Sequence, residues 1–205
     1  MFGIFQAFIE IKFRTTIALQ RCGGSLISRN TIISAAHCFQ RWGEGDVLLM
    51  PEFVEVTLGD HNIVSISPTK TERTYRISNI DIHPDYEHAT LRNDIAKLYL
   101  DEPIDFAKNP KIRPICLPAD ANEEYIGRDA KATGWGVMKR YTPAEVLQEI
   151  NIRIISMGEC NHRLRNFHKR RARHHLATAN MICAQGDVPK LGDVPRICRG
   201  GYFLN

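Results

Sequence analysis

Short apolar segments rich in β-forming residues recur along the chain, and turn-forming Gly, Pro, Asn and Asp residues separate them. The segments span residues 7–13, 31–34, 54–58, 75–82, 95–100, 130–134 and 149–155. This spacing favours an antiparallel sandwich or barrel over βαβ units. We therefore predict an all-β fold.

Helical pattern is scarce, and residues 156–164 are the candidate helix. Ser156 is a suitable N-cap, and Glu159 follows it at the spacing of a capping box. Gly158 lies in the first turn and weakens this prediction.

A proline-containing stretch at 114–118 and a polar run at 119–124 predict a linker between two halves. We place the linker at about residues 114–127, the first half at about 1–113 and the second at about 128–205. With 205 residues, 43% apolar and 24% charged, the composition fits one globular domain or two fused half-size ones.

Six cysteines are more than a reduced cytosolic enzyme usually carries, so they predict disulfides and an oxidising compartment. They stand at positions 22, 38, 116, 160, 183 and 198, without the C-x-x-C spacing of zinc or redox sites. Residues 1–10 lack the basic start and unbroken apolar core of a signal peptide, and no window reaches the ~18 apolar residues of a membrane span. A missing N-terminal segment that carries the signal peptide would explain why disulfides are predicted although residues 1–10 show no such signal.

The net charge of +4 is concentrated in one acid-free stretch. Six basic residues give this stretch a larger positive charge than the whole chain has. They are Arg163, Arg165, Lys169, Arg170, Arg171 and Arg173. The rest of the chain is slightly acidic, so the charge does not indicate a nucleic-acid-binding protein. Three interpretations of this basic stretch stay open: a solvated surface, a patch for sulfated polysaccharide or acidic lipid, and a dibasic cleavage site.

His37 differs from the other seven histidines, which we interpret as structural, because of its neighbours. The run Cys-Gly-Gly-Ser-Leu-Ile at 22–27 precedes it by one hairpin's length, and Asp94 follows it ahead of an apolar strand. A histidine that accepts a nucleophile's proton needs a buried carboxylate to hold its other ring nitrogen and stabilise the imidazolium. His37 and Asp94 are therefore candidates for a general base and its orienting acid.

Eight motifs, in the same order, resemble those of the chymotrypsin-like (trypsin-fold) serine endopeptidases. They are Cys-Gly-Gly-Ser-Leu-Ile at 22–27, Ser-Ala-Ala-His-Cys at 34–38, Val-Thr-Leu-Gly-Asp at 56–60, His-Pro-Asp-Tyr at 83–86, Asn-Asp-Ile-Ala at 93–96, Pro-Ile-Cys-Leu-Pro at 114–118, Thr-Gly-Trp-Gly at 133–136 and Met-Ile-Cys-Ala at 181–184. The resemblance implies two six-stranded antiparallel β-barrels, the second incomplete here, within a single peptidase domain over 1–205. It also implies catalysis in the cleft between the barrels, with His37 as base and Asp94 as its partner.

The chain departs from the family at the nucleophile. The family continues from its last cysteine motif as Cys-x-Gly-Asp-Ser-Gly-Gly-Pro, whereas residues 198–205 are Cys-Arg-Gly-Gly-Tyr-Phe-Leu-Asn. Gly201 stands in place of the aspartate and Tyr202 in place of the serine. A phenol with a pKa of about 10 on a rigid ring cannot replace a serine, so we expect the chain to be inactive as written. Of the oxyanion hole, Gly200 is the remnant.

Two further departures concern specificity and activation. Arg196 stands where trypsin-type members place the aspartate at the base of their pocket, so a preference for basic substrates is not predicted. Residues 1–4 are Met-Phe-Gly-Ile, without the Ile-Val-Gly-Gly start whose ammonium pairs with the aspartate beside the serine. We therefore expect a domain truncated at both ends.

By the same resemblance, Cys22 should pair with Cys38, and Cys160 with Cys183. Cys116 and Cys198 should lack partners, because in relatives these partners lie in a propeptide and in a C-terminal region that we expect to be absent.

Residues 58–63 resemble the start of the calcium loop of some family members. Asp60 and Asn62 fit, but Lys70 stands about where a glutamate is expected. We therefore predict no cofactor and no metal site.

Three interpretations of the whole chain are open. It is a truncated serine endopeptidase domain, a non-catalytic homologue that acts as a binding or regulatory module, or a fragment that does not fold stably. For a parent protease the resemblance implies an extracellular location and protein substrates or protease-cascade partners.

Overall fold

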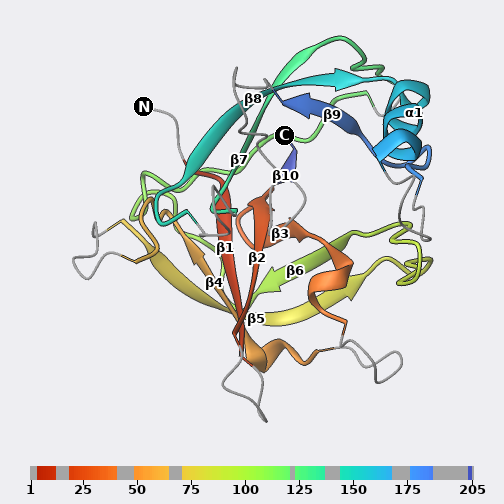
Figure 1. Cartoon of the computed structure of the whole chain (residues 1–205). Helices are drawn as coiled ribbons and strands as arrows, with labels where there is room; N and C mark the ends of the chain where they lie inside the picture. The colour runs from red at the N-terminus through yellow and green to blue at the C-terminus, as the bar shows by residue number, and fades with distance from the viewer. Residues whose placement is uncertain are drawn as a thin grey trace.

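A computed structural model describes residues 4–12, 19–40, 49–64, 71–120, 123–136, 144–167, 176–186 and 203–204. Its first half is a closed antiparallel barrel in which the strands follow the order β1-β2-β3-β6-β5-β4 (Figure 1). These strands are β1 (Gln6–Lys12), β2 (Leu19–Leu26), β3 (Thr31–Ser34), β4 (Val54–Leu58), β5 (Arg73–Ile82) and β6 (Ala96–Leu100). The all-β prediction is confirmed, and five of the six strands fall on segments that the pattern indicated.

Alternation of apolar and polar residues explains why the barrel closes. Successive strand residues point to opposite faces, so every second side chain enters the interior. On β1 the inward residues are Ala7, Ile9 and Ile11, all fully buried. The same period places the buried side chains of β4 and β6 in this interior; they are Val54, Val56, Leu58, Ala96, Leu98 and Leu100.

Strand β2 was not among the predicted strands because Gly23 and Gly24 interrupt its apolar pattern. The structure shows why glycine is present: a Cβ on Gly24 would lie 2.7 Å from Ile32 Cγ2 and 3.0 Å from the carbonyl oxygen of Ile33. Neighbouring strands approach too closely here for any side chain. The glycines therefore belong to a central strand of the barrel rather than to a loop.

The second half is a smaller sheet with strand order β10-β7-β8-β9. Its strands are β7 (Asp129–Gly134), β8 (Gln148–Ile155), β9 (Cys183–Gly186) and β10 (Phe203–Leu204). Figure 1 shows β7, β8 and β9 above the barrel, with helix α1 (Met157–Phe167) at the edge of the sheet. The expected second barrel is thus a four-stranded sheet in the described part of the chain.

Helix α1 begins where the sequence predicts and extends three residues further, to Phe167. The main-chain N–H of Glu159 donates to Ser156 Oγ at 3.2 Å, so Ser156 caps the helix. Glu159 also forms an ion pair with Arg163 one turn later, which supports the helix beyond the predicted end.

The two halves are joined by specific contacts. Residues 61–63 pair with residues 145–147 through backbone hydrogen bonds of 3.0 and 2.8 Å. Phe8 from β1 packs edge-on against Trp135, with ring centroids 5.6 Å apart. These contacts dock the second sheet against the barrel.

Candidate active site

A short 3₁₀ turn, η1 (Ala36–Cys38), carries His37 directly after β3. The turn is closed by a hydrogen bond from the Phe39 N–H to the Ala36 carbonyl at 3.0 Å. A disulfide joins Cys38 to Cys22 on β2, with the two Cα atoms 6.4 Å apart. His37 is therefore fixed at the end of a barrel strand by both the turn and the covalent link.

Asp94 lies in a tight turn immediately before β6. Asn93 adopts a left-handed backbone conformation with φ of 53°, which asparagine tolerates better than most residues. Its side-chain amide donates to the Asp85 carbonyl at 2.8 Å, and its carbonyl oxygen accepts a hydrogen bond from the side chain of Asn180. The turn that presents Asp94 is thus held from the first barrel and from the loop before β9.

His37 and Asp94 make two hydrogen bonds to each other. The main-chain N–H of His37 donates to Asp94 Oδ1 at 2.8 Å, and His37 Nδ1 lies 2.7 Å from Asp94 Oδ2. A carboxylate at that distance favours the tautomer with the proton on Nδ1, which leaves the lone pair of Nε2 free. The His37 side chain is 42% exposed and that of Asp94 22%, so the imidazole is accessible while the carboxylate is more sheltered.

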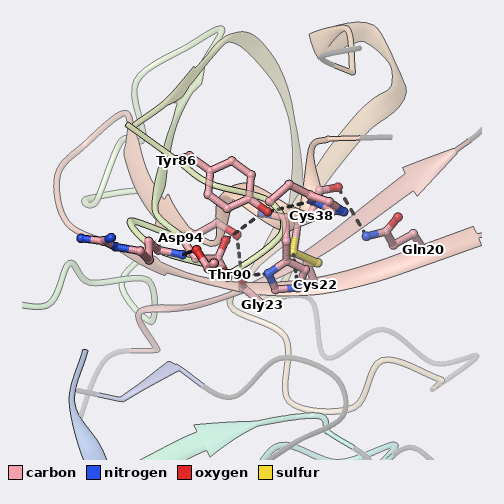
Figure 2. A network of polar contacts seen from close by, with 11 residues as sticks. Gln20, Cys22, Gly23, Cys38, Tyr86, Thr90 and Asp94 are labelled. Atoms are coloured by element: carbon pink, nitrogen blue, oxygen red, sulfur yellow. Dashed lines mark hydrogen bonds and ion pairs between the residues drawn. A yellow bond between two sulfur atoms is a disulfide. The ribbon is translucent and has the colours of Figure 1, made fainter. Parts of the chain in front are cut away.

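Tyr86 is a member of this site to which we assigned no role from the sequence, although its His-Pro-Asp-Tyr motif was recognised. Burial, and then the negative charge of Asp94, raise the pKa of Tyr86 to about 12. Its hydroxyl lies 3.1 Å from His88 Nδ1. Figure 2 shows the polar network that includes Tyr86, Asp94 and the Cys22–Cys38 disulfide. A phenol beside the carboxylate therefore stays neutral over the physiological range.

The disulfides implied by the resemblance are both present in the structure. The second joins Cys160 on α1 to Cys183 on β9, with Cα atoms 6.1 Å apart. Cys116 carries a free and exposed thiol. Cys198 lies outside the described residues.

Several predicted site residues also lie outside the described part of the chain. They are Gly200, Gly201 and Tyr202 of the nucleophile motif, Arg196 of the pocket, and Lys169, Arg170, Arg171 and Arg173 of the basic stretch. Arg163 and Arg165, the described members of that stretch, lie on α1. Arg163 is already paired with Glu159, so it is a weaker attractor of external anions than its charge alone suggests.

Two loci contain groups that bind metals elsewhere. Asp60 Oδ1 accepts from the N–H of Asn62 at 2.9 Å, and Asn62 Oδ1 accepts from the N–H of Val64 at 3.1 Å, so both oxygens shape their own loop. Around His37, a ring nitrogen and the sulfurs of Cys22 and Cys38 lie within 4.8 Å of one another. The sulfurs are bonded to each other and are not thiolates, so this cluster is not a zinc site while oxidised.

None of the described helices combines the length and apolar character needed to cross a membrane.

Comparison with known proteins agrees with this geometry. The family model for trypsin matches residues 4–200. The serine proteinase stubble of Drosophila melanogaster is 33% identical over 141 residues, which cover 68% of this chain and 17% of that protein. The serine protease filzig of the same organism is 33% identical over 163 residues, which cover 78% of this chain and 9% of that protein.

The fold also has a close counterpart among solved structures. One described as "Structure of GrC" has a TM-score of 0.69 at 24% identity, covering 88% of this chain and 69% of its own. The matched region spans less than a fifth of either Drosophila relative. With the barrel, the ordered motifs and the match over nearly its whole length, the chain belongs to the trypsin family.

Proposed function

We propose that this chain is the peptidase-fold region of a trypsin-like serine endopeptidase, in which His37 is the general base and Asp94 its orienting acid. The observation that carries the proposal is the 2.7 Å contact between His37 Nδ1 and Asp94 Oδ2, supported by a second bond from the His37 main chain. The family match supports the reaction class, hydrolysis of peptide bonds in protein substrates.

In this mechanism Nε2 of His37 takes the proton of an attacking hydroxyl, and Asp94 stabilises the resulting imidazolium. Asp94 holds the ring in one tautomer and one orientation throughout, because it bonds both Nδ1 and the main-chain N–H. The neutral Tyr86 adds no second negative charge beside the carboxylate.

We further propose that the chain as written does not itself cleave peptides. Tyr202 stands at the serine position and Gly201 at the neighbouring aspartate position. Losing one oxyanion donor costs about 10²–10³ in rate, and triad members act as a unit, so two of three retain little of the triad's gain. A form with Asp-Ser at 201–202 would be the active parent.

The location and partners of the parent follow from the same reasoning. Two disulfides and the trypsin family suit an extracellular protein whose substrates are proteins. The exposed thiol of Cys116 is a suitable partner for a cysteine in a propeptide.

The test is a serine-directed phosphonate probe and peptide ester substrates of Arg, Lys, Phe and Ala. The purified chain should show neither labelling nor hydrolysis, and His37→Ala should change nothing measurable. Stoichiometric labelling that disappears in His37→Ala would refute the inactive form. Sequencing the transcript beyond the codon for Gly200 then tests the parent, which should encode Asp-Ser-Gly-Gly-Pro.

A second candidate function is a non-catalytic module that binds a sulfated polysaccharide, and the acid-free basic stretch favours it. The same preparation should then be retained on heparin in a salt-sensitive manner, because counterion release drives binding to a polyanion. Replacing Lys169, Arg170 and Arg171 with Ala should shift elution to lower salt. Unchanged elution would remove this candidate without affecting the first.

A further inference from the structure

We infer that reducing the Cys22–Cys38 disulfide converts the surroundings of His37 into a Cys₂His site for Zn²⁺. Three potential ligand atoms already converge there: the two sulfurs and a ring nitrogen of His37 lie within 4.8 Å of one another. The inference concerns a binding site and stands whether or not the chain hydrolyses peptides.

The spacing matches a zinc tetrahedron. Bonds of about 2.3 Å to sulfur and about 2.0–2.1 Å to nitrogen place the two ligand atoms about 3.6 Å apart. His37 Nε2 and Cys38 Sγ are 3.8 Å apart, so this edge of the tetrahedron is preformed. Once the S–S bond is broken, rotation of the Cys22 side chain moves its sulfur away from Cys38 Sγ to the sulfur–sulfur distance that the tetrahedron requires.

The hydrogen bond from His37 Nδ1 to Asp94, which orients the imidazole as a base, also orients it as a metal ligand. Asp94 Oδ2 accepts from Nδ1, and so directs the free lone pair of His37 to Nε2, the atom beside the sulfur. A carboxylate behind a histidine in this way raises its basicity as a ligand and fixes its ring. The His37 side chain is 42% exposed, which leaves room for water as the fourth ligand.

The backbone positions of the ligands do not depend on the disulfide alone. Cys22 pairs with Ile9 in the β1–β2 ladder, and the turn around Cys38 is closed by its own main-chain hydrogen bond. His37 is held through its N–H by Asp94. Thiolate and imidazole ligands together select zinc over calcium or magnesium.

A phosphine supplies the two electrons that reduction of the Cys22–Cys38 disulfide requires. The phosphine is oxidised to its oxide with an oxygen from water, while the disulfide takes up two electrons and two protons and becomes two thiols. Zn²⁺ then displaces both protons to solvent and accepts lone pairs from two thiolates and Nε2. Since Nε2 is then bound, zinc would block the base that the proposed function requires.

The experiment is alkylation of the phosphine-reduced chain with and without Zn²⁺, with every cysteine quantified separately by peptide mapping. Zinc should slow alkylation of Cys22 and Cys38 by about tenfold or more, whereas calcium should not, and exposed Cys116 is the internal control. Asp94→Asn should weaken zinc binding by about 10–100-fold, as loss of such a supporting carboxylate does. His37→Ala should abolish the protection, and His83→Ala is the matched control.

Equal alkylation of Cys22 and Cys38 with and without zinc would overturn the inference, as would protection that persists in His37→Ala. Circular dichroism of the reduced chain shows whether the barrel unfolds on reduction. Loss of the β-sheet signal that zinc does not restore would also contradict the inference. Co²⁺ in place of Zn²⁺ should give a tetrahedral spectrum with charge transfer from two thiolates, and a four-thiolate spectrum would count against the site.

Discussion

Asp94 shows how a single side chain acquires its role from the backbone around it. The left-handed conformation of Asn93 turns the chain so that both carboxylate oxygens of Asp94 meet His37. Asn93 is itself bonded on two sides, by Asp85 and by Asn180. The candidate base is therefore oriented by a carboxylate whose own turn is anchored in both halves of the molecule.

Tyr86 gives a pH-dependent prediction. Its pKa is raised to about 12, chiefly by burial, while an unfolded tyrosine titrates near 10. Between these values the folded state keeps the proton that the unfolded state loses, so this stabilisation is complete below pH ~10 and is lost as the pH rises through about 12. With Cys116 alkylated beforehand, Tyr86→Phe should lose stability less steeply than the native chain over this interval, as measured by urea unfolding. Parallel pH profiles would contradict this, as would a folded-state phenolate absorbance that Tyr86→Phe already lowers near pH 10.

The packing of β2 against its neighbours shows an element whose identity depends on contacts distant in sequence. Gly24 permits the close approach of Ile32, and β2 also carries Cys22 of the disulfide beside His37. The disulfide therefore links β2 covalently to the turn that holds the imidazole.

Gly24→Ala should destabilise the chain by about 1–3 kcal/mol, because the added methyl overlaps Ile32 and the backbone of Ile33. Gly186→Ala is the matched control, since its Cβ would meet nothing within 4 Å and should change stability by no more than about 0.5 kcal/mol. Urea midpoints of the two variants provide the measurement. Equal midpoints would show that the strands can separate without cost.

The molecule as a whole is unevenly packed. The buried apolar cluster runs from Ala7 to Ile112 and lies within the first barrel. Among the described residues after Ile112, the buried apolar side chains are those of Ala132, Trp135, Ala144 and Ile152. The second sheet therefore relies more on its docking contacts and on the Cys160–Cys183 disulfide.

This imbalance predicts a difference in local stability. Amide hydrogens of β7, β8 and β9 should exchange at least about tenfold faster than those of β1, β4 and β6, because elements with fewer buried contacts open at lower free energy. Hydrogen exchange read by mass spectrometry resolves the two halves. Uniform protection across them would mean that the chain opens only as one unit.

The sequence was sufficient to predict the strands that alternate cleanly and the Ser156 cap, and the family resemblance implied the pairing of four cysteines. Strand β1 follows from alternation because one face of a strand must be apolar to be buried, and the cap follows from the need of the first helical N–H groups for acceptors. The motif around His37 identified a family and a candidate base, because these residue types are required together for proton transfer. At Tyr202 the sequence departs from the family's nucleophile motif. The inactivity that we expect from this departure stays a prediction.

Tertiary structure decided the rest. Whether Gly24 belongs to a strand depends on Ile32 and Ile9 across the sheet, and no local pattern contains that information. The raised pKa of Tyr86, the anchoring of Asn93 by Asn180 and the convergence of His37 with two sulfurs all join residues distant along the chain. Such properties depend on distances in space, because electrostatic and packing forces act only between groups that the fold has brought together. The barrel sets these distances when it closes by pairing β1 with both β2 and β4.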